Sequence, residues 1–158
     1  MTDSNQLSPI KILLIEDNPG DIRLTKEALK DGKIKNEIRI ITDGEEALLF
    51  LKKEGQYQNE ETPDVILLDL NLPKKDGREV LLEIKSDPNF KTIPVIILTI
   101  SSDERDILKS YSHYANCYIT KPIDFNEFIN VVKTIENFWF TIVKIPNQTL
   151  RLPSEKYD

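Results

Sequence analysis

Short apolar runs recur along the chain, separated by segments in which apolar residues return every three or four positions. There are four such runs and a shorter fifth, at Lys11–Glu16, Glu37–Thr42, Asp64–Asp69, Pro94–Thr99 and Asn116–Thr120. Most of them are continuously apolar rather than alternating, which is typical of strands that are covered on both faces, as in a parallel sheet. The runs therefore predict five buried parallel strands.

The intervening segments have the period of amphipathic helices. We expect helices within residues 18–32, 44–55, 77–88, 102–114 and 124–143. Asn18 has the side chain of an N-cap, and Pro19 suits the first helical position. Acidic residues begin the segment 44–55 and lysines end it, which complements a helix dipole. The last segment, 124–143, is the longest of the five.

The alternation of strands and helices predicts the α/β class, with a doubly wound five-stranded parallel sheet and right-handed crossovers. A chain of 158 residues has the length of one compact domain. We expect a flexible N-terminus over residues 1–9, a single domain with an extended last helix over 10–143, and an extended tail over 144–158.

Composition narrows the classes of function. The chain has 21 basic and 27 acidic residues and a formal net charge of −6, which argues against binding to nucleic acid or to an anionic membrane surface. No stretch approaches the ~20 apolar residues of a membrane span, and the N-terminus lacks the pattern of a signal peptide. With a single cysteine, no intrachain disulfide can form, so we expect a cytoplasmic protein.

Polar residues follow the predicted strands. Glu16 and Asp17 end the first strand, Asp69 ends the third, Thr99 ends the fourth and Lys121 follows the fifth. In open parallel sheets ligands bind outside the carboxyl ends of the strands, and these ends share one edge. A structural cap explains a single carboxylate well, but it explains a convergent set poorly.

Three carboxylates at one edge repel each other. At ~4 Å and an effective dielectric constant near 20, each like-charge pair costs about 4 kcal/mol, so either one carboxyl stays protonated or a cation lies among them. Oxygen ligands favour Mg²⁺, with Mn²⁺ as a second choice. The backbone carbonyl of Asn71, two residues beyond Asp69, is a candidate further ligand.

A carboxylate beside a divalent cation can attack a phosphoryl group and form an aspartyl phosphate. Lys121 and the Thr99 hydroxyl could then stabilise the phosphoryl oxygens. The chain has no P-loop and no GxGxxG motif, so it lacks the usual means of holding a nucleotide. The phosphoryl donor must therefore come from elsewhere.

Taken together, Glu16-Asp17, Asp69, Thr99 and Lys121-Pro122 resemble the motifs of the receiver domain of two-component response regulators, over about residues 10 to 140. The resemblance implies a flavodoxin-like (βα)5 fold with strand order 2-1-3-4-5. It also implies that Glu16, Asp17 and Asp69 hold Mg²⁺, and that Asp69 accepts a phosphoryl group from a phosphohistidine of a sensor histidine kinase.

The same resemblance assigns further roles. It implies that Lys121 contacts the phosphate, that the Lys121–Pro122 peptide bond is cis, and that Thr99 and Tyr118 form a switch pair. The hydroxyl of Thr99 would move to the phosphate, and the ring of Tyr118 would turn inward behind it. The output would be a repositioned protein-interaction surface rather than a turnover reaction.

The end of the last predicted helix is unusually apolar. One stripe of residues can pack inward at helical spacing, but Phe138, Phe140 and Val143 cannot all share it. One interpretation is a longer helix that covers more of the core. The other is a homodimer interface that includes Phe138, Trp139, Phe140 and Val143, because exposed aromatic patches usually mark interfaces.

This apolar end, the polar insert at residues 52–64 and the stretch LNLPKKDGREVL at 70–81 resemble the small response regulators paired with cyanobacterial phytochromes. That subfamily implies a phytochrome-type histidine kinase as partner and a homodimer formed through the last helix.

Two alternatives compete with a phosphoacceptor regulator. Metal-dependent phosphohydrolases that use an aspartyl phosphate generally carry a second aspartate two residues beyond the nucleophile, and here that residue is Asn71, which cannot transfer the proton. A binding-only pseudo-receiver would need a broken acidic cluster, whereas all the acidic residues are present in this chain.

Overall fold

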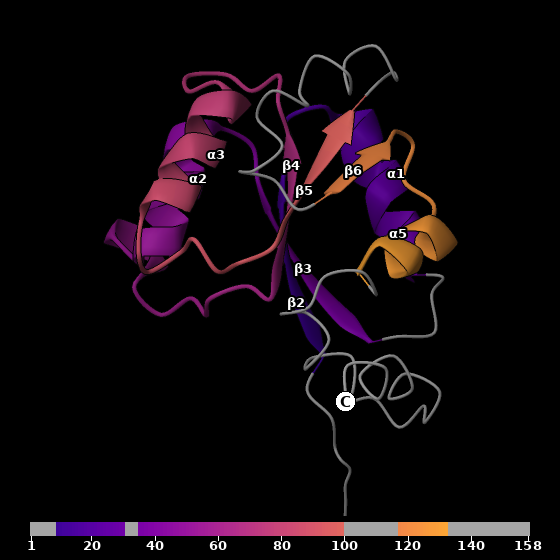
Figure 1. The fold of residues 1–158 in the computed structure, drawn as a ribbon, viewed down its shortest axis with the longest axis horizontal. Helices are drawn as coiled ribbons and strands as arrows, with labels where there is room; N and C mark the ends of the chain where they lie inside the picture. Colours follow the sequence, from indigo (N-terminus) through magenta and orange to yellow (C-terminus); the bar gives the residue numbers. More distant parts are fainter. Residues whose placement is uncertain (1–8, 31–34, 100–116, 133–158) are drawn as a thin grey trace, which may run out of the picture.

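The computed structural model describes residues 9–30, 35–99 and 117–132 of the chain (Figure 1). Within them, five parallel strands form one sheet in the order β3-β2-β4-β5-β6. The strands are β2 (Ile10–Ile15), β3 (Asn36–Ile41), β4 (Val65–Asp69), β5 (Val95–Thr99) and β6 (Cys117–Thr120). Counted along the chain, this order is 2-1-3-4-5, so the doubly wound sheet is confirmed.

Helices cover both faces of the sheet. Those in the described residues are α1 (Pro19–Lys30), α2 (Gly44–Lys52), α3 (Gly77–Ser86) and α5 (Phe125–Val132), with a 3₁₀ turn, η1 (Gly55–Tyr57). Figure 1 shows α2 and α3 on one side of the strands and α1 and α5 on the other. No described helix is long and apolar enough to cross a membrane.

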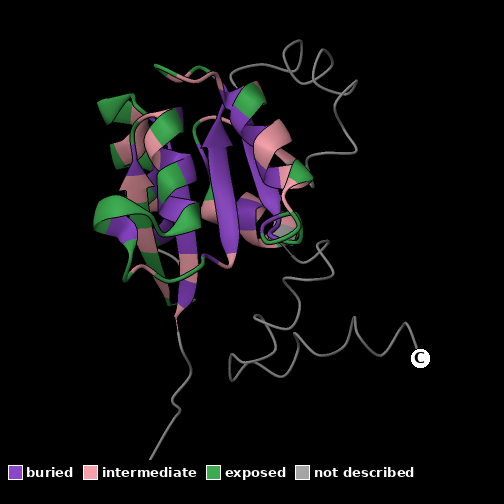
Figure 2. Cartoon of the chain, turned by 90° about the vertical axis from the view of Figure 1, so that its left-hand side faces the viewer, coloured by how far each residue is buried: buried purple, intermediate pink, exposed green. Residues whose placement is uncertain are grey.

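Each central strand contributes to two cores. Leu13 and Ile15 of β2 pack into the core beneath α2 and α3, whereas Ile12 and Leu14 pack into the core beneath α1 and α5. All five residues of β4 are buried, and Figure 2 shows mostly purple strands at the centre of the molecule. This burial on both faces is the reason why the sequence shows continuous apolar runs instead of alternation.

Side chains cap the N-termini of α1, α2 and α3. Asn18 Oδ1 accepts a hydrogen bond from the backbone N–H of Asp21 at 2.9 Å, and Asp43 Oδ1 accepts one from Glu46 at 2.8 Å. At the start of α3, the side chains of Asp76 and Glu79 form a reciprocal capping box. These bonds satisfy N–H groups that have no partner within the helix.

Several element boundaries differ from the prediction by one to three residues. The helix expected over 44–55 ends at Lys52, because Lys53 adopts a left-handed backbone with φ 60° and its N–H returns to the carbonyls of Leu49 and Phe50. The first strand covers Ile10–Ile15 rather than 11–16, since Glu16 already leads into the turn before α1. The helix expected over 102–114, and the part of 124–143 beyond Val132, lie outside the described residues.

Candidate functional site at the carboxyl edge of the sheet

The acidic residues predicted at the strand ends lie together. β2 and β4 are neighbours, with Ile15 opposite Leu68, so Glu16 and Asp17 emerge next to Asp69, the last residue of β4. One carboxylate oxygen from each of these three residues lies within 4.8 Å of the other two. Glu16 and Asp69 are buried, whereas Asp17 is exposed. The sequence-based prediction that the three carboxylates converge is confirmed.

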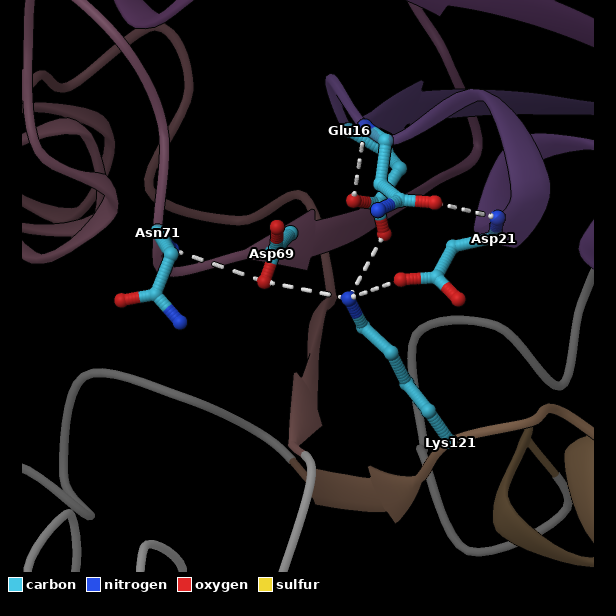
Figure 3. A network of polar contacts seen from close by, with 6 residues as sticks. Glu16, Asp21, Asp69, Asn71 and Lys121 are labelled. Carbon is cyan, nitrogen blue, oxygen red and sulfur yellow. Dashed lines mark hydrogen bonds and ion pairs between the residues drawn. The ribbon is translucent and has the colours of Figure 1, made fainter.

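Lys121 reaches the cluster from the end of β6. Its Nζ lies 3.0 Å from Glu16 Oε1, 3.0 Å from Asp21 Oδ2 and 3.4 Å from Asp69 Oδ1. The Lys121–Pro122 peptide bond is cis, as the resemblance implied. Figure 3 shows the ammonium of Lys121 among the carboxylates of Glu16, Asp21 and Asp69.

The protonation of the cluster follows from its burial. Burial, reinforced by the hydrogen bond and negative charge of Asp69, raises the pKa of Glu16 to about 7, although the ammonium of Lys121 opposes this rise. Burial by itself lowers the pKa of Lys121, but its contacts with Asp21 and Glu16 and the charge of Asp69 raise that pKa above its ordinary value. Lys121 therefore stays a cation while Glu16 titrates near neutrality.

The donor set fits a small divalent cation. Glu16 Oε1 is fully buried and, although it lies 3.0 Å from Lys121 Nζ, it has no hydrogen bond. An unsatisfied buried carboxylate oxygen costs free energy, and a cation held by it and by the oxygens of Asp17 and Asp69 would remove that cost. Three carboxylates without thiol or imidazole groups are typical ligands of Mg²⁺ or Mn²⁺.

Glu16 makes the stability of the metal-free protein depend on pH. Because its pKa is about 7 in the folded state against 4.5 ordinarily, folding favours the protonated form. This stabilisation is complete below about pH 4.5 and is lost as the pH rises through about 7. We expect the free energy of unfolding of wild type, relative to Glu16→Gln, to fall by up to about 3 kcal/mol between pH 5 and pH 8.

Urea unfolding in the presence of a chelator at both pH values measures this difference. Glu45→Gln, a change at an exposed residue of α2, is the matched control. Its free energy of unfolding should change between the two pH values by the same amount as that of wild type. If the free energy of unfolding of Glu16→Gln also changes with pH by the same amount as that of wild type, the prediction is contradicted.

Of the remaining predicted residues, Thr99 and Asn71 lie at the same edge. Thr99 is the last residue of β5, and its pairing with Thr120 puts its backbone at the carboxyl edge. Asn71 is exposed, and its backbone N–H lies 3.5 Å from Asp69 Oδ1. Tyr118 is half-buried against the core beneath α2 and α3. Phe138, Trp139, Phe140 and Val143 lie outside the described residues.

Sequence reasoning missed Asp21, whose carboxylate is as close to Lys121 as that of Glu16. Asp21 lies in the first turn of α1, which starts at Pro19 just beyond the carboxyl end of β2, so it stays near the same edge. The acidic first turn of a helix that starts at the carboxyl edge was the signal that could have identified it.

Known proteins are similar to this chain in sequence and in fold. The family model described as the response regulator receiver domain matches residues 12–133. The response regulator Rcp1 of Synechocystis sp. is 48% identical over 144 residues, which cover 90% of this chain and 98% of Rcp1.

Two solved structures extend the comparison. The phosphorylated cyanobacterial phytochrome response regulator RcpA superposes with a TM-score of 0.69 at 51% identity, covering 89% of this chain and all of RcpA. The Mn²⁺-bound form of Rcp1 superposes with a TM-score of 0.66 at 50% identity, covering 83% of this chain and 94% of Rcp1. With the strand order and the acidic edge described above, these similarities establish that the chain belongs to the response regulator receiver domain family.

Proposed function

We propose that this response regulator accepts a phosphoryl group on Asp69 from a phosphohistidine of a sensor histidine kinase. The observation that carries the proposal is the meeting of Glu16, Asp17, Asp69 and Lys121 at one edge of the sheet. The carboxylate of Asp69 attacks phosphorus, the bond between phosphorus and the histidine nitrogen breaks, and the imidazole leaves with the bonding electrons.

Glu16, Asp17 and Asp69, together with the backbone carbonyl of Asn71, would hold a divalent cation, Mg²⁺ or Mn²⁺. The related Rcp1 has been solved in a Mn²⁺-bound form. When bound, the cation neutralises negative charge on the phosphoryl oxygens. The ammonium of Lys121, already among the carboxylates, supplies a second positive charge to the same oxygens.

Thr99 and Tyr118 are our candidates for the switch. The hydroxyl of Thr99 would donate to the phosphoryl group, and the ring of Tyr118 would move with it. This would change a protein-interaction surface of a single domain covering residues 10–143, preceded by a flexible N-terminus over 1–9 and followed by an extended tail over 144–158. Such a regulator acts in signalling, as a phosphoprotein rather than an enzyme with turnover.

We further propose that the kinase is a phytochrome. The support is the similarity to Rcp1 and to RcpA, a cyanobacterial phytochrome response regulator. The pair would act in the cytoplasm, without nucleic acid or membrane as a partner of the regulator. By the same similarity the regulator would form a homodimer through Phe138, Trp139, Phe140 and Val143 of its last helix.

Incubation of the full chain with Mg²⁺ and a small phosphodonor tests the proposal. We expect one alkali-labile phosphoryl group per chain, seen as a single mass increment, and none when a chelator removes Mg²⁺. Continuous release of phosphate over many turnovers would instead indicate a phosphohydrolase. Neither labelling nor release would indicate a pseudo-receiver, and either of these results would overturn the proposal.

A further inference from the structure

In this structure the ammonium of Lys121 lies among carboxylates and donates a hydrogen bond to Asp21 Oδ2 at 3.0 Å. An ammonium carries three N–H donors, and three carboxylates surround Nζ, those of Glu16 and Asp21 at 3.0 Å and that of Asp69 at 3.4 Å. A phosphoryl group on Asp69 needs at least one of these donors. Because Asp21 Oδ2 already accepts a hydrogen bond from Nζ, an anion that arrives at Asp69 competes with Asp21 for the ammonium.

The three partners differ in how readily they can be released. The side chain of Glu16 is 0% exposed and that of Asp69 is 6% exposed, whereas that of Asp21 is 33% exposed. A buried carboxylate that loses its cation stays desolvated, but a partly exposed one regains water. Asp21 also lies in the first turn of α1, where the helix dipole favours its negative charge even without Lys121.

We infer that Asp21 competes with an arriving phosphoryl group for the ammonium of Lys121. It holds the ammonium while Asp69 is unmodified and yields it to the anion that arrives at Asp69. The inference rests on the proposed function and adds a residue to it. Asp21 and the phosphoryl group then compete for the same N–H. The carboxylate of Asp21 therefore lowers the affinity of the site for a phosphoryl group, or for its mimic, while Asp69 is unmodified.

Removing this competitor should strengthen anion binding. We expect Asp21→Asn to bind beryllium trifluoride, a phosphoryl mimic, roughly twofold to fivefold more tightly than wild type in Mg²⁺, as a partly exposed ion pair implies. The half-saturating concentration of a small phosphodonor should fall by a similar factor, and by more than the maximal rate changes. Asp21→Glu keeps the carboxylate and should return both values towards wild type.

Glu27→Gln is the matched control, because it removes one negative charge from an exposed position of α1. If Asp21→Asn and Glu27→Gln behave alike, the effect is one of overall charge and the inference fails. Weaker binding of beryllium trifluoride by Asp21→Asn would also overturn it, because the carboxylate would then be needed to present Lys121 to the anion.

A double-mutant cycle separates this inference from the proposed function. Asp21→Asn, Lys121→Met and their combination are compared by urea unfolding without metal or phosphodonor, and Lys121→Gln replaces Lys121→Met if the latter does not fold. We expect a stabilising coupling between Asp21 and Lys121. Zero coupling overturns the inference even if Asp69 is phosphorylated, whereas coupling in a protein that accepts no phosphoryl group overturns the proposed function alone.

Discussion

Replacing Asp69 by asparagine is expected to abolish phosphoryl transfer to this protein. The amide has nearly the size of the carboxylate but is a far weaker nucleophile towards phosphorus. Asp69 is only 5% exposed at the end of β4, so no other carboxylate can occupy its position. Mass spectrometry after incubation with Mg²⁺ and a small phosphodonor should show one phosphoryl group on wild type and none on Asp69→Asn.

The matched control is Asp87→Asn, the same change at the far end of α3. Asp87 Oδ1 accepts a hydrogen bond from the backbone N–H of Asn89 at 2.8 Å, and the amide oxygen of asparagine can accept it as well. This variant should be phosphorylated like wild type. Labelling of Asp69→Asn to the wild-type level would show that the acceptor is another residue.

Replacing Gly77 by alanine is expected to destabilise the fold and to disturb the site at once. A Cβ at this position would lie 2.5 Å from Leu70 Cα and 2.6 Å from the carbonyl oxygen of Asp69. The N–H of Gly77 also donates to the carbonyl of Leu70 at 2.9 Å. Because both clashes involve backbone, either α3 or the end of β4 must move, at a cost of about 3 kcal/mol in the free energy of unfolding.

Gly20→Ala is the matched control, the same change in the first turn of α1. There the added Cβ would meet only the side-chain oxygen of Asn18, at 3.3 Å, and alanine is the better helix former. We expect Gly20→Ala to match wild type in urea unfolding or to exceed it slightly. A Gly77→Ala protein with wild-type stability and wild-type phosphorylation would refute the close packing of β4 against α3.

Much of the site could be predicted from local patterns and one rule of topology. Continuous apolar runs identified parallel strands, and parallel strands bring their carboxyl ends to one edge. Glu16 and Asp69 end such runs, and Asp17 and Lys121 follow them directly, so their convergence required no knowledge of side-chain packing. The same reasoning identified Asn18 as the cap of α1.

The misses have physical causes. The end of α2 at Lys52 depends on the left-handed backbone of Lys53, which an ordinary lysine does not reveal in the sequence. Asp21 looked like one more acidic residue in the first turn of a helix. Its partner Lys121 lies 100 residues further along the chain, and no periodicity connects residues so far apart.

By itself, the sequence determined the fold class, the strand order through its family resemblance, and the carboxylates and lysine that meet at the carboxyl edge. Those features follow from which residues avoid water and from where each strand ends. Only the tertiary structure decided how deeply each carboxylate is buried and which of them contact the ammonium of Lys121. Burial and ion-pair geometry depend on the packing of all neighbouring elements, and that packing is what places the pKa of Glu16 near 7 and leaves Asp21 the most exposed partner of Lys121.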